Sequence, residues 1–67
     1  MSNDSEMLGE WVNQGYFLKE YYDDILVCYK DNGSRELASF NYNLATPKAL
    51  QDVCKRHQAT LVEGVAK

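Results

Sequence analysis

The sequence predicts an α+β domain: a three-stranded antiparallel β-meander with one amphipathic helix packed on one face, followed by a short C-terminal fourth strand (β-β-β-α-β). Two observations carry this prediction. First, two β-strand patterns, 25–31 and 34–42, flank Asn32-Gly33, the dipeptide that best tolerates positive φ at both centres of a type I′ hairpin turn. Second, apolar residues recur at helical spacing over 47–58.

The strands are expected to form a meander with 25–31 at its centre. Side chains of a first strand, 16–22, alternate between two faces, and Asp23-Asp24 then makes a short polar break. The run 25–30 is almost continuously apolar, which is typical of a central strand. The third strand, 34–42, shows the alternation of a half-buried strand.

The helix is the clearest single element. Thr46 is a good N-cap and Pro47 suits the first helical position, where no N–H is needed. Asp52 and Arg56 can pair at i, i+4. One apolar arc of this helix comprises Leu50, Val53, Cys54 and His57.

Both ends of the chain carry weaker signals. Residues 1–7 are polar and are expected to be a disordered arm. Residues 8–15 form either a short helix capped by Asp4 or Ser5, or an irregular arm that lays Trp11 over the edge of the core. The run 60–66 is expected to be the fourth strand, completing a right-handed crossover. The expected core comprises Leu18, Ile25 or Leu26, Val27, Cys28, Phe40, Leu50, Val53, Cys54 and Leu61.

Size and charge limit the classes of function. A single domain of 67 residues with 45% hydrophobic residues has little apolar area left to line a deep catalytic pocket. Residues 1–24 carry six acidic residues against one base, a balance of −5, whereas 25–67 carry four acidic against six basic residues, a balance of +2. An acidic first third disfavours phosphate backbones as partners and favours a basic protein surface.

The sequence favours a cytoplasmic protein. Its first residues have neither the basic nor the apolar region of a signal peptide, and no apolar run reaches transmembrane length. Two cysteines cannot form a disulfide scaffold, so we expect reduced thiols. A single bridge between Cys28 and Cys54 is the alternative.

The residues capable of chemistry do not form a convincing catalytic or metal site. Cys28, Cys54 and His57 could supply three ligands of a zinc site, but the fourth ligand is lacking. Cys54 and His57 could also act as a catalytic Cys–His pair, but the pair lacks a third group to orient it. Buried thiols behave as inert apolar groups. We therefore expect no catalytic residue, no metal and no cofactor, and a protein that is not an enzyme.

The segment that points to a function is acidic and aromatic. We expect a non-catalytic binding surface for a protein partner with a basic surface, on the tyrosine-rich sheet face that the helix leaves uncovered. Ordinary cross-strand tyrosine pairing on the solvent face is the alternative explanation. The residues of the expected surface are Trp11, Glu20, Tyr21, Tyr22, Asp23 and Asp24.

Two other functions are left open. The basic helix residues Lys48, Lys55 and Arg56 would serve a regulator that binds nucleic acid. Alternatively, an exposed strand edge would join two copies into a homodimer.

In overall organisation the chain resembles the small acidic accessory proteins with which bacteriophages inhibit host machinery. Like them it is short, poor in cysteine and built from a small sheet and a helix. The resemblance covers the whole chain without matching individual residues. It implies an inhibitor or modulator of a larger cytosolic machine.

Overall fold

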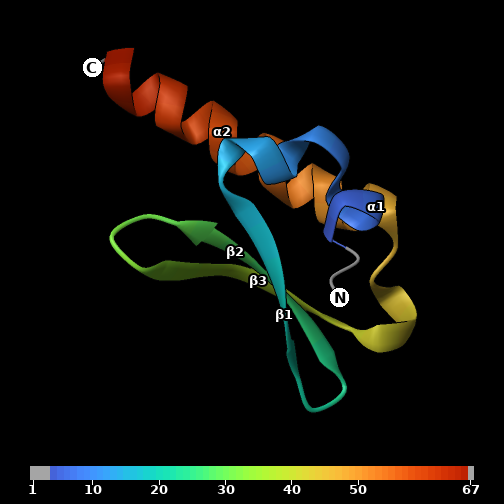
Figure 1. Ribbon diagram of the computed structural model, residues 1–67. Helices are drawn as coiled ribbons and strands as arrows, with labels where there is room; N and C mark the ends of the chain where they lie inside the picture. Colours follow the sequence, from blue (N-terminus) through green and yellow to red (C-terminus); the bar gives the residue numbers. More distant parts are fainter. Residues whose placement is uncertain (1–3, 67) are drawn as a thin grey trace.

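The chain forms a small sheet whose strands lie, in sequence, between two helical regions. A computed structural model describes residues 4–66 (Figure 1). No helix in that range has the length and apolar character needed to cross a membrane. In chain order the elements are α1 (Asp4–Leu8), the 3-10 helix η1 (Gly9–Gln14), β1 (Tyr16–Tyr21), β2 (Asp24–Lys30), β3 (Ser34–Asn41), the 3-10 turn η2 (Tyr42–Leu44) and α2 (Pro47–Ala66).

The three strands form the predicted antiparallel meander in the order β1-β2-β3. The β2–β3 connection follows the Asn-Gly signal, because Asn32 and Gly33 both have positive φ, 58° and 120°. Lys30 pairs with Ser34, so the loop has three residues rather than the two of a strict type I′ hairpin. The prediction of an α+β fold built on this meander is confirmed.

All helices lie on one side of the sheet, and the core fills the space between (Figure 1). Thr46 caps α2 as predicted, since its Oγ1 accepts a hydrogen bond from the Ala49 N–H at 3.2 Å. Two of the core residues, Leu8 and Tyr16, were not in the core expected from the sequence. Leu18, Phe40 and Val53 pack against the core without full burial. The core cluster comprises Leu8, Tyr16, Ile25, Val27, Leu50 and Cys54.

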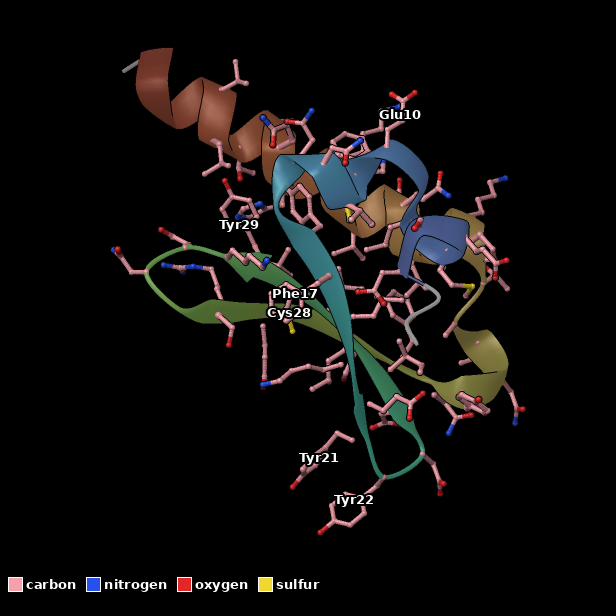
Figure 2. The ribbon with its side chains drawn as sticks, in the orientation of Figure 1. Glu10, Phe17, Tyr21, Tyr22, Cys28 and Tyr29 are labelled. Carbon is pink, nitrogen blue, oxygen red and sulfur yellow. The ribbon has the colours of Figure 1, made fainter. Side chains whose placement is uncertain are left out.

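Cys28 lies on the other side of the sheet. It pairs with Phe17, whereas the neighbouring pairs, Tyr16 with Tyr29 and Leu18 with Val27, face the helices. Its side chain is nevertheless buried, and Figure 2 shows Phe17 and Cys28 close together over β1 and β2. The expectation that Cys28 is buried is therefore confirmed, although it is buried outside the main core cluster. A disulfide between the two cysteines is not formed, since both thiols are free.

The expected fourth strand at 60–66 is wrong, because α2 continues through this range to Ala66. Leu61 lies seven residues after Cys54 and four after His57, so it extends the same helical stripe. The Thr60 hydroxyl donates to the carbonyl of His57 at 2.6 Å, so its polar group is satisfied within the helix. The residue between 47–58 and 60–66 is Ala59, a strong helix former, so no turn signal separates the two ranges.

The N-terminal segment is part of the folded unit from Asp4 onward, in contrast to the arm expected over residues 1–7. Residues 1–3 of that range lie outside the described residues. Leu8 is fully buried, and the Asp4 carboxylate accepts a hydrogen bond from the Leu18 N–H at 3.1 Å. A buried leucine and a bond to a strand edge explain why a short polar-looking segment is ordered on the sheet.

Candidate functional site

The β1–β2 turn carries the acidic and aromatic residues that the sequence singled out. Tyr21 pairs with Asp24, so Tyr22 and Asp23 form a two-residue turn at the end of the hairpin. Figure 1 places this turn at the end of the molecule remote from α2. We call this region the hairpin tip, and it comprises Glu20, Tyr21, Tyr22, Asp23, Asp24 and Tyr42.

Tyr22 has an unusual conformation. Its φ is +56°, a left-handed value that is common for Gly but rare for residues with a side chain other than Asn and Asp. Its side chain is 90% exposed and that of Tyr21 is 59% exposed. The two rings meet edge to face, with centroids 4.5 Å apart, and both extend away from the sheet in Figure 2. Two large rings therefore project from the tip, one of them from a backbone position that disfavours it.

Tyr42 is a third exposed ring at the same end, and sequence reasoning missed it. Its N–H donates to the Asp23 carbonyl at 2.9 Å, and its side chain is 66% exposed. The available signal was the strand register: Asn41 pairs with Asp24, which brings the next residue of the chain opposite the β1–β2 turn.

The carboxylates of the tip surround a shallow hollow of about 210 Å³ beside Tyr22 and Tyr42. Glu20 and Asp23 are exposed and Asp24 is half-buried. Neither of the two ion pairs among the described residues involves them; those pairs join Arg35 to Asp31 and Arg56 to Asp52. The tip thus presents three carboxylates without a paired base, a composition that can accept hydrogen bonds from cations and N–H donors.

The tip coincides only in part with the uncovered sheet face on which the binding surface was expected. By the strand register, the uncovered face carries Phe17, Lys19 and Tyr21 of β1, Leu26, Cys28 and Lys30 of β2, and Glu36 of β3 opposite Cys28. The Lys30 ammonium lies 6.0 Å from the centre of the Phe17 ring. This face therefore mixes apolar, basic and acidic side chains, and it shares Tyr21 with the tip. The acidic tyrosine surface lies at the end of the hairpin because Tyr16 and Tyr29 are used in the core or against it.

Trp11 does not belong to the hairpin tip. Its ring meets Tyr16, the first residue of β1, edge to face at 5.8 Å between centroids. The turn lies six residues further along the strand, roughly 20 Å away at the usual rise of a β-strand. The structure therefore brings together five of the six residues of the expected surface and separates Trp11 from them.

The Cys54–His57 pair lies where α2 meets the core: Cys54 is fully buried, and His57 is half-buried and within hydrogen-bond distance of Tyr16. The Tyr16 hydroxyl donates to Gln58 Oε1 at 3.2 Å and lies 2.8 Å from His57 Nδ1. Burial, together with the nearby Cys54 and Tyr29, raises the pKa of Tyr16 to about 12, and burial raises the pKa of the Cys54 thiol to about 11. Both groups are thus held in their neutral forms. In the described part of the chain, no group of three or more His, Cys, Asp or Glu is placed to hold a metal ion.

The basic residues of α2 divide into two surroundings. Lys48 and Lys55 line a groove of about 610 Å³ that Trp11 also lines. Arg56 instead binds Asp52 at 2.9 Å, the i, i+4 pair expected from the sequence. Lys48 and Lys55, the candidates for nucleic-acid binding, therefore line the same groove as Trp11, a candidate for protein binding.

Comparison with known proteins identifies no relative. No protein-family model matches the chain, and no curated protein or solved structure shows significant similarity to it. The function is accordingly inferred from the geometry alone.

Proposed function

We propose that this protein is a non-catalytic binding protein whose hairpin tip attaches it to a basic surface on a protein partner. The observation that carries the proposal is Tyr22, an aromatic ring 90% exposed on a backbone with φ of +56°. A strained residue that persists on the surface is a sign of selection for something other than stability. An exposed tyrosine gives a partner a large contact area with few rotatable bonds.

The charge of the tip supports a basic partner. Three carboxylates lie within the five residues 20–24, which include no base; the preceding Lys19 lies on the sheet face opposite to Glu20. Such a cluster accelerates encounter with a positive surface and repels a negative one. Action as an inhibitor or modulator of a larger cytosolic machine is one form that such binding would take.

The test is comparative capture of cell proteins on the immobilised protein. Tyr22→Ala combined with Asp23→Lys is expected to lose the captured partner, whereas the circular dichroism spectrum stays unchanged because both side chains are exposed. Captured partners are also expected to be released by salt, since exposed charge pairs are screened.

A matched control makes the comparison specific. Val62→Ala combined with Glu36→Lys also removes one exposed apolar side chain and reverses one exposed carboxylate, but both positions lie outside the tip. The control should capture the same partners as the wild type. If the tip variant captures them equally well, the binding surface is elsewhere.

A further inference from the structure

A groove lies beside Trp11, separate from the hairpin tip. It lies between η1 and α2, and its position depends on contacts that hold the N-terminal segment to the helix: Leu8 is buried in the core, and Gln51 Nε2 donates to the Met7 carbonyl at 3.0 Å. We call it the Trp11 groove. Its volume is about 610 Å³, and its lining residues are Trp11, Thr46, Lys48, Ala49, Gln51, Asp52 and Lys55.

The Trp11 groove combines an aromatic ring with positive charge. Lys48 and Lys55 are seven residues apart on α2, which places them about 10.5 Å apart along one side of the helix. Neither lysine forms an ion pair with any residue of the described chain. The carboxylate of Asp52 is already engaged by Arg56 at 2.9 Å. The groove therefore offers two unpaired ammonium groups beside half-buried Trp11.

A ligand that suits this groove carries carboxylates next to an aromatic ring. Carboxylates would pair with the ammonium groups, and an aromatic ring would pack against the tryptophan. The hairpin tip of this same chain has this combination: three carboxylates, two of them exposed, beside the exposed rings of Tyr21 and Tyr22. These groups lie at the two-residue turn that ends the hairpin, so they can meet such a groove end-on.

The tip cannot reach the groove of its own molecule. Trp11 contacts the start of β1 and the tip lies at the other end of that strand, and Figure 1 shows the turn and the η1–α2 region at opposite sides of the molecule. Any such contact must therefore be made between two copies.

We propose that this protein self-associates head to tail, with the hairpin tip of one copy seated in the Trp11 groove of the next. The inference rests on the proposed function of the tip as a binding surface and names a second copy of the chain as a partner. The contact is heterologous, so a dimer joined by one such contact still has one free tip and one free groove, and further copies can add to it unless a ring closes. A contact of this size is weak and reversible.

A strand-edge dimer is less favoured by the structure. The outer edge of β1 is partly occupied, since the Asp4 carboxylate accepts from the Leu18 N–H. The β2–β3 pairing is irregular at Val27/Cys28, and such irregularities disfavour edge-to-edge pairing. Charge reversal in the Trp11 groove would leave a strand-edge dimer intact, so the two arrangements can be distinguished.

The experiment is sedimentation velocity of the full chain from about 20 μM to about 1 mM at low salt, a range suited to weak contacts. The wild type should sediment faster as its concentration rises. Glu20→Lys with Asp23→Lys, the tip variant, should remain monomeric, and so should Lys48→Glu with Lys55→Glu, the groove variant. Each change replaces attraction by repulsion and should lower the association constant roughly tenfold or more.

Mixing the two variants is the decisive measurement. Each variant alone brings like charges together, but the tip of the groove variant still matches the groove of the tip variant. The mixture should therefore associate. A Lys19→Glu, Lys30→Glu variant has the same net charge as the groove variant but alters the uncovered sheet face, and it should associate like the wild type.

Trp11 supplies a second readout, because it is the single tryptophan of the chain. Its fluorescence should change as wild-type concentration rises and when the two variants are mixed. The proposal is overturned if the wild type stays monomeric throughout, or if the groove variant associates as well as the wild type does. A fluorescence response to single-stranded oligothymidylate at low salt, without self-association, would also overturn it and assign the groove to nucleic acid.

Failure of this proposal is distinguishable from failure of the proposed function. If Tyr22→Ala with Asp23→Lys loses the captured protein partner while the wild type remains monomeric, the tip binds another protein and the head-to-tail contact is wrong. If partner capture survives that double change but the mixture of the two charge-reversed variants associates, the tip serves self-association alone.

Discussion

Leu8→Ala tests whether the N-terminal segment is part of the folded unit. The Leu8 side chain is fully buried in the core cluster. Its truncation removes three carbon groups, worth about 2.4 kcal/mol at about 0.8 kcal/mol each. Residual cavity adds to this loss, and buried Leu→Ala changes typically cost about 2.7–5.0 kcal/mol. Because α1 is short and can shift to close part of the space, we expect about 3 kcal/mol, near the lower end of that range.

The loss would be large for a domain of this size, whose total stability is about 3–10 kcal/mol. The midpoint of thermal unfolding should fall by roughly 12–24 °C. Circular dichroism gives the midpoint, and Trp11 fluorescence reports whether the Trp11 groove persists in the folded variant. Val62→Ala is the control, since that side chain is 61% exposed and should change stability by less than about 0.5 kcal/mol. A loss below about 1 kcal/mol for Leu8→Ala would refute the packing described above.

Three further predictions follow from individual contacts. Tyr22→Asn should keep or slightly raise the free energy of unfolding, because Asn tolerates positive φ, yet abolish partner capture; a clear loss of stability would contradict the strain argument. Tyr16→Phe removes the hydroxyl that contacts His57 and Gln58 and should cost about 1 kcal/mol in denaturant unfolding; an unchanged midpoint would show that these bonds add nothing. Burial raises the pKa of Cys54 from 9.0 to about 11, so on raising the pH this thiol ionises first in the unfolded chain. The free energy of unfolding should therefore fall by about 2 kcal/mol between about pH 9 and 11. Cys54→Ala should remove that part of the decline, and a pH profile identical to that of the wild type would refute the assignment.

Local signals explain which elements could be predicted. Asn32-Gly33 supplies the positive φ of the β2–β3 turn, and Thr46-Pro47 begins α2, because both depend on residues adjacent in sequence. The end of α2 was mispredicted for a similar reason. The β-branched residues of 60–66 suggest a strand, but Leu61 also continues the helical stripe, and the local pattern does not decide between them.

The candidate site was predicted only in part. Five residues of the expected surface are contiguous, 20–24, so their meeting at the hairpin tip required only a turn. Tyr42 joins them through the β2–β3 register, and Trp11 leaves them because it packs on Tyr16. Contacts between residues far apart in sequence depend on packing, which local patterns do not encode.

The sequence by itself determined the meander, the start of the long helix and the presence of an acidic, tyrosine-rich segment, since each depends on backbone preferences and spacing within a few residues. Only the tertiary structure decided which tyrosines are free. Tyr16 is buried by contacts with Trp11, Tyr29 and His57, whereas Tyr22 projects from a turn that no described element covers. The same type of side chain thus stabilises the core at one end of β1 and forms a candidate binding surface at the other, because burial is a property of the assembled fold.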